Sequence, residues 1–194
     1  MYYPSLEACL LLLEKNNQLI RIKEEVDPYL EMAAIHLRVH ENGGPALLFE
    51  KVKGCRYRAA SNIFGTLQRS ELIFKDTLAN VQKLIALKDN PVQALKHPIK
   101  NLGAAVAALK AFPKKNPITK PVLFEEIKIS NLPQIHHWPM DGGAFITLPQ
   151  VYTEDIDKPG IANANLGMYR IQLSGNDYKM DEEVGLHYQL HRGI

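Results

Sequence analysis

The first half of the chain alternates between apolar positions that repeat with a helical period and short continuous apolar runs. Behind Ser5, a favoured N-cap residue, the helical repeat predicts a first helix that ends at Asn16, and a strand is expected over 19–22. A second helix is expected to begin at Asp27 and Pro28 and to end at the glycines 43–44. Its buried stripe is expected to consist of Leu30, Ala33, Ala34 and Leu37.

Three more elements are expected before residue 112. Residues 46–49 form a continuous apolar run that predicts a buried strand, and 58–64 predict a further strand. A helix is expected over 77–88, and its inward face is expected to consist of Leu78, Val81, Leu84 and Ile85. Helices that alternate with strands are typical of α/β structure, so residues 1–112 are expected to form an N-terminal α/β domain.

After Pro121 the apolar repeat changes to two residues, which is the period of a strand. Strands are expected over 122–129, 145–152, 168–173 and 184–191. The prolines within 113–121 indicate a linker. The sequence therefore predicts an α+β protein with a mostly β domain over 122–194. Because four strands without a covering helix leave open sheet edges, the chain is interpreted as the N-terminal part of a longer protein.

Composition and charge exclude several classes of protein. With 46% hydrophobic and 23% charged residues among 194, the chain has the composition of a globular protein rather than a disordered or fibrous one. The net charge of +2 predicts no nucleic-acid partner. The apolar runs are too short for a membrane span, and residues 1–13 lack the features of a signal peptide, so a cytoplasmic location is expected. Cys9 and Cys55 have no metal-ligand spacing and are expected to be reduced.

Polar side chains concentrate on two predicted strands near the end of the chain. On the first strand, alternation places on one face Met168, Arg170 and Gln172. On the second strand, it aligns His187, Gln189 and His191. Two histidines four residues apart on a strand are separated by about 13 Å, so at most one of them binds a given metal. A histidine together with the amide oxygen of Asn165 would suit Mn²⁺ or Mg²⁺ better than structural Zn²⁺. From spacing alone, exposed polar residues on an open sheet face are the simpler interpretation.

Other conspicuous segments receive a structural interpretation. The segment His-His-Trp-Pro at 136–139 resembles a metal or stacking site, but adjacent histidines point in different directions and a lone Trp beside Pro is usually packed, so a packed loop is expected. The glycines of 43–45 and 141–143 lack the spacing of a phosphate-binding fingerprint and are interpreted as turns. No Gly-x-Ser-x-Gly elbow occurs, which argues against a hydrolase of that kind.

Five segments resemble, in residues and in order, the UbiD family of decarboxylases, which use prenylated FMN. They are 43–54, 62–65, 146–149, 165–170 and 191–193. The most specific of them is the run Asn-x-Gly-x-Tyr-Arg at 165–170, which follows a Leu-Pro strand. Family members are longer than this chain. The resemblance therefore implies their N-terminal α/β domain followed by the first strands of a flavin-binding split β-barrel.

The resemblance also implies a set of site residues. Asn165 matches a ligand of the divalent metal that bridges the cofactor phosphate, and His191 matches a residue at the metal and flavin site. The implied ion is Mn²⁺ or Mg²⁺, with K⁺ as a further candidate. Arg170 matches the catalytic arginine that orients the substrate carboxylate between acidic residues; those acids and a metal-binding Glu are expected beyond residue 194. The residues that match the cofactor-binding runs are Met168, Tyr169, Arg170, His187, Tyr188, Gln189, Arg192 and Gly193.

The implied activity is reversible, non-oxidative decarboxylation of an aromatic or α,β-unsaturated acid, with quinone precursors of ubiquinone biosynthesis and phenolic acids both open as substrates. The implied partners are the small carboxylic acid, a flavin prenyltransferase that supplies the cofactor, and further copies of the chain in a homo-oligomer. The 194-residue chain alone is expected to be inactive. Two alternatives remain open: a non-catalytic module that binds a partner or completes another subunit's site, and a flavin reductase-like split barrel that binds ordinary FMN.

Overall fold

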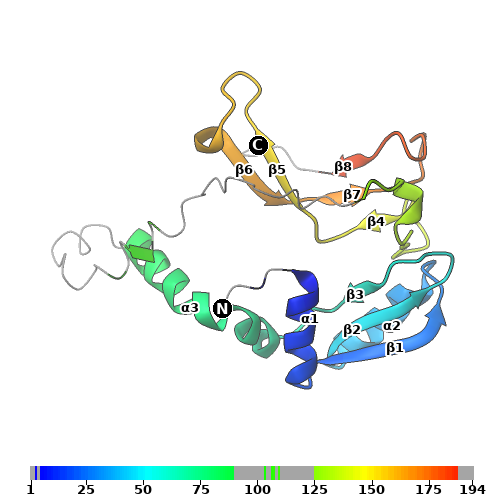
Figure 1. Ribbon diagram of the computed structural model, residues 1–194, viewed down its shortest axis with the longest axis horizontal. Helices are drawn as coiled ribbons and strands as arrows, with labels where there is room; N and C mark the ends of the chain where they lie inside the picture. Colours follow the sequence, from blue (N-terminus) through cyan, green and yellow to red (C-terminus); the bar gives the residue numbers. More distant parts are fainter. Residues whose placement is uncertain are drawn as a thin grey trace.

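A computed structural model of the chain describes residue 3, residues 5–89, residues 103, 106, 107 and 109, and residues 125–187 (Figure 1). Helices and strands alternate up to residue 89, and strands dominate after residue 125, so the protein has the mixed helix and sheet structure that the sequence predicts. The expected linker at 113–121 lies outside the described residues. Within the described ranges, no helix combines the length and the apolar character needed to cross a membrane.

The first half is built around a three-stranded sheet in the order β1-β2-β3. The strands β1 (Leu19–Val26) and β2 (Ala46–Val52) are parallel, and α2 (Glu31–Glu41) lies on the crossover between them. The short strand β3 (Ala59–Ser61) pairs antiparallel with β2. The first four residues of β2 are buried, which confirms the buried strand expected over 46–49.

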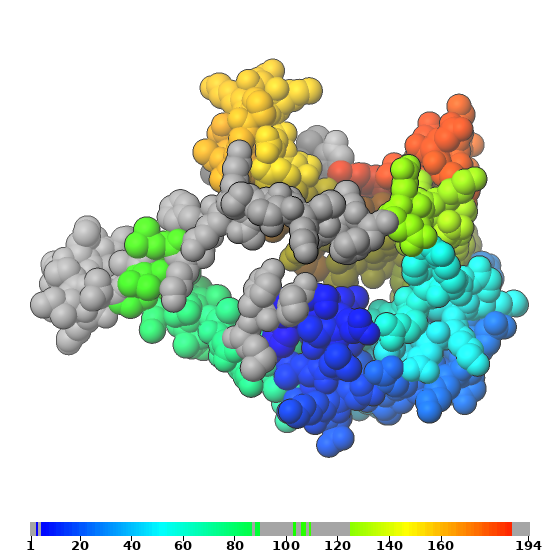
Figure 2. All heavy atoms as spheres, viewed as in Figure 1, coloured from blue at the N-terminus to red at the C-terminus, as the bar shows by residue number. Residues whose placement is uncertain are grey.

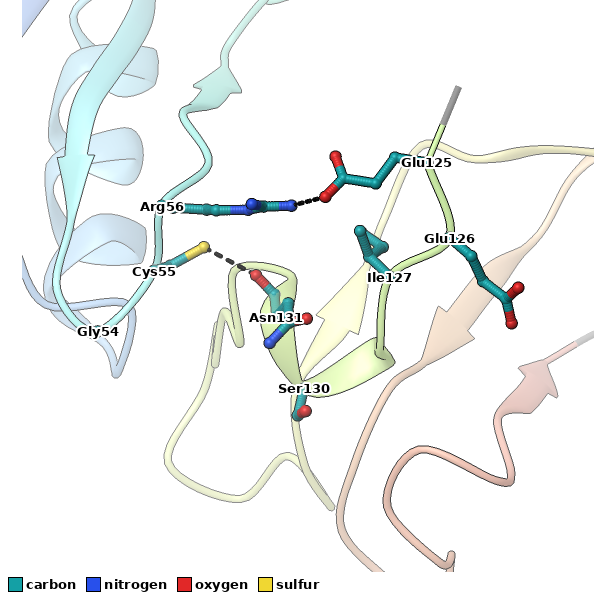
Figure 3. A pocket seen from close by; sticks show the side chains of 8 residues that line it. All are labelled: Gly54, Cys55, Arg56, Glu125, Glu126, Ile127, Ser130 and Asn131. Carbon is teal, nitrogen blue, oxygen red and sulfur yellow. Dashed lines mark hydrogen bonds and ion pairs between the residues drawn. The ribbon is translucent and has the colours of Figure 1, made fainter. Parts of the chain in front are cut away.

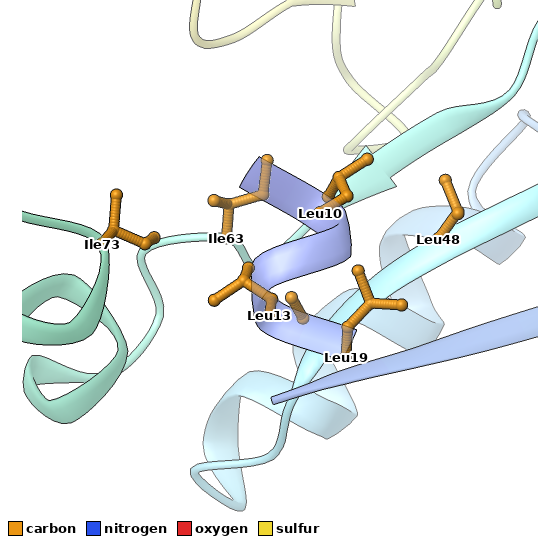
Figure 4. Close-up of a cluster of buried hydrophobic side chains, with 7 residues drawn as sticks. Leu10, Leu13, Leu19, Leu48, Ile63 and Ile73 are labelled. Carbon is orange, nitrogen blue, oxygen red and sulfur yellow. The ribbon is translucent and has the colours of Figure 1, made fainter. Parts of the chain in front are cut away.

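The two faces of this sheet carry separate hydrophobic clusters because successive side chains of β2 point to opposite sides. On one face Leu48 packs with Leu10 and Leu13 of α1 (Leu6–Lys15), in the cluster drawn in Figure 4. On the other face Leu47 packs with Met32 of α2. The expected first helix is confirmed, because α1 begins at its N-cap Ser5, whose Oγ accepts a hydrogen bond from the backbone N–H of Ala8 at 3.2 Å.

The second helix differs from the prediction in its start and in its buried face. It begins at Glu31 rather than at Asp27, because Asp27 Oδ1 accepts the backbone N–H of Tyr29 at 2.8 Å and its Oδ2 binds Lys53 Nζ at 2.8 Å. Leu30 has a φ of 64°, outside the helical region. The predicted stripe is wrong, since Ala34 and Leu37 are exposed. The side chains that pack on the sheet are Met32, Ile35 and Val39.

The third helix, α3 (Leu67–Asp89), begins ten residues before the expected start at 77 and extends away from the first sheet (Figure 1). It joins the cluster under α1 through its early residues Leu72 and Ile73. The prediction that Val81 and Ile85 face inward is wrong, because their side chains are 46% and 54% exposed. The apolar period thus predicts a helix here correctly, but the residues of α3 that join the cluster under α1 come from its early turns.

The second half contains a three-stranded antiparallel sheet in the order β4-β7-β8 and a separate β5-β6 hairpin. The expected strand over 145–152 is divided into β4 (Phe145–Ile146) and β5 (Gln150–Glu154). The strand expected over 168–173 is interrupted at Tyr169, so that Met168 ends β6 (Ala164–Met168) and β7 (Arg170–Gln172) follows. Of the strand expected over 184–191, β8 (Gly185–His187) is described and the rest lies outside the described residues. Among the described strands there is no closed barrel.

The strand expected over 122–129 is wrong in its described part. Residues 125–128 have no regular structure, and Ile129–Asn131 form a 3₁₀ turn, η1. A second 3₁₀ turn, η2 (Ile161–Asn163), precedes β6. The backbone N–H of Lys128 donates to Asn131 Oδ1 at 3.3 Å, so it caps the 3₁₀ turn and does not pair with a neighbouring strand.

The two halves contact each other through the segment that leads into β4. The backbone N–H of Leu30 donates to the carbonyl of His136 at 3.2 Å, and the N–H of His136 donates to the carbonyl of Pro28 at 3.0 Å. Ile135 packs against the cluster on the α2 side of the first sheet. In Figure 2 the cyan atoms of the first half meet the yellow-green atoms that follow residue 125. This contact also explains why α2 begins late, because the backbone of 28–30 pairs with His136.

Candidate functional site

One face of the β4-β7-β8 sheet gathers the polar side chains that the sequence singled out. Phe145 of β4 lies opposite Gln172 of β7, and Arg170 of β7 lies opposite His187 of β8. Since residues two apart on a strand share a face, Phe145, Arg170, Gln172 and His187 all project to the same side. The prediction that Arg170 and Gln172 share a face is confirmed, and His187 joins them there, but Met168, which was expected on the same face, belongs to β6 in the other sheet.

Arg170 is held by two neighbours, one charged and one aromatic. Its Nη2 donates to Asp141 Oδ1 at 2.9 Å, and its guanidinium carbon lies 3.5 Å from the centre of the Phe145 ring. The Arg170 side chain is 37% exposed, whereas that of Asp141 is 11% exposed. The guanidinium therefore remains accessible while its carboxylate partner is nearly enclosed.

The environment of Asp141 favours its charged form. Burial acts to raise the pKa of Asp141, but the hydrogen bond and charge of Arg170 and the backbone N–H groups of Trp138 and His137 lower it further, so the pKa lies below its usual value. The Trp138 N–H reaches Asp141 Oδ2 at 3.2 Å. At neutral pH the pair is thus a carboxylate with a guanidinium.

Gln172 and His187 form the second part of this face, and Gln172 is fully buried rather than exposed. The Nε2 of Gln172 donates to the carbonyl of Ser174 at 3.0 Å, which leaves its amide oxygen to face His187 Nε2 at 2.9 Å. His187 Nε2 is accordingly the donor in this pair, and the His187 ring meets Phe145 edge-on at 5.3 Å between centroids. These contacts orient the imidazole.

Asn165, the expected metal ligand, is oriented by Tyr169. Its Nδ2 donates to the hydroxyl of Tyr169, whose ring lies over the backbone of Gly167. A Cβ at Gly167 would come within 2.6 Å of that ring, so the glycine leaves the space that the ring occupies. The amide oxygen of Asn165 has no hydrogen-bond partner among the described residues, and an amide oxygen held in this way fits a hard divalent cation.

The structure only partly brings the predicted site residues together. Asn165 lies in the β5-β6 hairpin and Arg170 in the β4-β7-β8 sheet, joined through Tyr169 and the half-exposed Met168. The described part of the chain has no group of three or more His, Cys, Asp or Glu side chains that could hold a metal ion. The predicted residues that lie outside the described ranges are Tyr188, Gln189, His191, Arg192 and Gly193.

Two residues beside Arg170 were missed from the sequence, Asp141 and His137. The segment 141–143 was interpreted as a turn, and the acids that the family resemblance implies around Arg170 were expected beyond residue 194; the structure adds Asp141 as a carboxylate in contact with Arg170. The Nδ1 atom of His137 is buried without a hydrogen-bond partner in the described structure. Burial, followed by the charge of Arg170, lowers the pKa of His137, so this imidazole is neutral at pH 7.

A separate polar pocket of about 420 Å³ lies between the two halves, and none of the predicted site residues lines it (Figure 3). Arg56 and Glu125 form an ion pair across it, and Cys55 Sγ donates to the carbonyl of Asn131 at 3.1 Å. The residues that line it are Gly54, Cys55, Arg56, Glu125, Glu126, Ile127, Ser130 and Asn131. Its contacts join the halves of the molecule and include none of the residues predicted to bind cofactor or metal.

Two family models match the chain. The N-terminal domain of 3-octaprenyl-4-hydroxybenzoate carboxy-lyase matches residues 10–88, and the Rift-related domain of the same enzyme matches residues 110–194. An uncharacterised protein of Chlamydia caviae is 40% identical over 200 residues, which cover 100% of this chain and 32% of that protein. A Chlamydia pneumoniae protein named as a 4-hydroxybenzoate decarboxylase subunit is 36% identical, over 94% of this chain and 30% of that protein. The chain thus spans about a third of the length of the curated relatives it matches.

Solved structures share the fold. The vanillic acid decarboxylase of Sedimentibacter hydroxybenzoicus in its closed form matches with a TM-score of 0.69 and 27% identity, over 97% of this chain and 38% of that one. The UbiD-class enzyme HmfF of Pelotomaculum thermopropionicum, in complex with prFMN, matches with a TM-score of 0.65 and 23% identity, over 95% of this chain and 38% of that one. The second likeness concerns the fold alone.

Proposed function

The chain belongs to the UbiD family of carboxy-lyases, and from this premise we propose that it forms part of a non-oxidative decarboxylase that uses prenylated FMN. The observation that carries the proposal is the oriented guanidinium of Arg170, held by Asp141 and Phe145 on an accessible sheet face. A planar guanidinium in a defined plane can pair with a carboxylate in bidentate fashion. This is the chemistry that a decarboxylase requires to orient its substrate.

The proposed substrate is a phenolic carboxylic acid. Two relatives are named as decarboxylases of 4-hydroxybenzoate and of vanillic acid, and the matching family model bears the name of a 4-hydroxybenzoate derivative that carries an octaprenyl chain. All three compounds are aromatic acids with a carboxylate opposite a hydroxyl. Arg170 would bind the carboxylate, the neighbouring His137 is neutral, and His187 is oriented by its contact with Gln172.

The proposed cofactor site follows the run 165–170. Asn165 would offer its free amide oxygen to a divalent ion at the cofactor phosphate, with Mn²⁺ or Mg²⁺ as the proposed ion and K⁺ as a further candidate. When bound, the modified isoalloxazine supplies the electron sink for loss of carbon dioxide. Tyr169 holds the amide, and Met168 presents an exposed side chain to the ligand. The cofactor or metal roles proposed from the family resemblance alone are those of Tyr188, Gln189, His191, Arg192 and Gly193.

The division into a domain over 1–112, a linker over 113–121 and part of a split barrel over 122–194 remains part of this proposal, as does a homo-oligomeric assembly. The relative named as a subunit favours an additional partner chain. We also propose that the 194-residue chain alone does not turn over. Among the described residues, the carboxylate in contact with Arg170 is that of Asp141. This pairing helps to keep Asp141 ionised, so Asp141 does not serve as a proton donor.

The test is decarboxylation by the protein purified from its native reading frame after co-expression with a flavin prenyltransferase. Loss of 4-hydroxybenzoate and of vanillate is followed by chromatography, and flavin content by absorbance. Arg170→Ala is expected to lower turnover by about 100-fold or more while sparing most of the flavin binding, since it removes the group that orients the carboxylate. Arg38→Ala, on the exposed side of α2, is the matched control and should turn over normally. Wild-type turnover by Arg170→Ala would remove Arg170 from the mechanism, and NADH oxidation with FMN would favour the reductase alternative.

A further inference from the structure

The geometry points to Asp141 as a positioning residue that sets the plane and direction of the Arg170 guanidinium. The inference rests on the proposed function for the role of Arg170 and concerns a residue in a loop before β4. Asp141 reaches Arg170 across 29 positions of sequence, at 2.9 Å. It would act through Arg170 and does not itself need to touch the substrate.

Two contacts of different kinds define the orientation of a planar group. Stacking on Phe145, at 3.5 Å, sets the plane of the Arg170 guanidinium, and the hydrogen bond to Asp141 sets its rotation within that plane. A guanidinium has five N–H donors, and Asp141 accepts one of them. Whichever hydrogen of Nη2 is taken, one complete pair of parallel donors remains free. The Arg170 side chain is 37% exposed, and the inference is that this pair of donors receives a second carboxylate.

Asp141 can perform this role because it is itself fixed. Its Oδ2 accepts the N–H of Trp138, and the backbone N–H of Asp141 donates to the Trp138 carbonyl at 3.0 Å. The loop is also held against the end of β7, since a Cβ at Gly143 would lie 1.7 Å from the carbonyl oxygen of Ser174. The glycines that the sequence showed as a turn therefore bring the carboxylate to a set position beside Arg170.

The competing interpretation is that Asp141 and Arg170 form an ordinary surface ion pair that does not fix the guanidinium. The burial of Asp141 argues against it. Exposed pairs are weak because both partners stay hydrated. The Asp141 side chain is only 11% exposed, so without Arg170 it would be a nearly enclosed carboxylate with backbone donors alone. Burial and the charge of Arg170 lower the pKa of His137, so this histidine is neutral and does not replace the guanidinium as a cation.

The experiment compares Asp141→Asn, Asp141→Glu and the control Asp177→Asn in the protein from its native reading frame. Asp177 is exposed, so its replacement makes the same change of charge without touching Arg170. One measurement needs no cofactor: rotation of the Arg170 guanidinium, followed by NMR with ¹⁵N-labelled arginine and assigned with Arg170→Lys. Slow rotation is expected in the wild type, in Asp141→Glu and in Asp177→Asn, and fast rotation in Asp141→Asn. Equally slow rotation in Asp141→Asn would overturn the inference.

The second measurement is kinetic and uses the flavin-loaded protein with 4-hydroxybenzoate. Asp141→Asn is expected to lower kcat/KM by about 10- to 100-fold at unchanged flavin content, and Asp141→Glu by less. Unchanged kcat/KM in Asp141→Asn would refute the positioning role while leaving the proposed function intact. An inactive wild type would refute the proposed function, and guanidinium rotation would then still decide the role of Asp141. If Asp141→Asn does not fold, Asp141→Glu decides: a reduced kcat/KM supports the role, and a wild-type value overturns it.

Discussion

Replacing Gly167 with alanine is the sharpest local test of how the run at 165–170 is organised. The added Cβ would lie 2.6 Å from Cε2 and Cζ of Tyr169 and 2.7 Å from its hydroxyl, whereas ordinary contact begins at 3.4 Å. The Tyr169 ring would have to move by about 0.8 Å to restore that contact. The hydrogen bond that the Tyr169 hydroxyl accepts from the amide of Asn165 would then lengthen and weaken. The substitution thus disturbs the orientation of Asn165, the proposed metal ligand, without replacing any residue proposed to bind the metal.

The substitution is expected to lower both the free energy of unfolding and the affinity for Mn²⁺. Overpacking together with weakening of one hydrogen bond predicts a fall in the free energy of unfolding of about 1–3 kcal/mol, measured by urea denaturation. Release of the Asn165 amide predicts a fall in Mn²⁺ affinity of about tenfold or more, measured by calorimetry. Gly103→Ala is the control, because among the described residues a Cβ there meets Lys83 Nζ alone, at an ordinary 3.6 Å. Wild-type stability together with an unmoved Tyr169 ring in NMR spectra of Gly167→Ala would refute the reasoning.

Three further predictions concern the first half of the chain. Leu13→Ala, at a fully buried position under α1, should lower the free energy of unfolding in urea by about 2–5 kcal/mol, whereas the exposed Leu11→Ala should change it little. Arg69→Met should lower it by about 2–5 kcal/mol, because the buried guanidinium donates to the carbonyls of Ile63 at 3.0 Å and Gly44 at 3.1 Å; an unchanged urea midpoint would contradict this. Burial, and then the charge of His40, lowers the pKa of His36, so the unfolded chain takes up this proton first and stability should fall as the pH drops below about 6.5. His36→Gln should reduce the difference between urea curves at pH 7.5 and 5.5, and an undiminished difference would exclude His36 as its source.

Elements whose signals are local were predicted well. The start of α1 depends on a cap between Ser5 and Ala8, three residues apart, and both residues are visible in the sequence. The burial of β2 follows from a continuous apolar run between two turns. In both cases the residues that determine the structure lie within the element or next to it.

Elements that depend on distant partners were predicted poorly. The start of α2 depends on Lys53, which binds Asp27 from the end of β2, and on His136, which pairs with the backbone at 28–30. Neither partner can be identified from the spacing of residues near 27. For α3 the period indicated an apolar stripe at Val81 and Ile85, but a period does not say whether a stripe meets the core.

The candidate site shows the same division. The polar face of Arg170 was predicted from alternation, and family resemblance indicated the residues 165–170 themselves. Asp141 could not be identified in the same way, because antiparallel pairing of β4 with β7 places it beside Arg170. A usable signal existed in the carboxylate just before β4, since Asp-Gly-Gly permits a close approach to the neighbouring strand.

The break between β6 and β7 at Tyr169 explains the spacing of Asn, Gly, Tyr and Arg in the run 165–170 better than a continuous strand would. Gly167 leaves room for the Tyr169 ring, so Tyr169 turns back to Asn165, and Arg170 begins a new strand beside Phe145. The amide and the guanidinium thereby acquire separate supports within six residues. Because strand faces alternate, a shift of one residue would send the guanidinium to the opposite face, where Ile146, Ile171 and Leu186 lie in register and Asp141 is out of reach. An insertion after Tyr169 should therefore abolish the Arg170 site even though every residue of the run is retained.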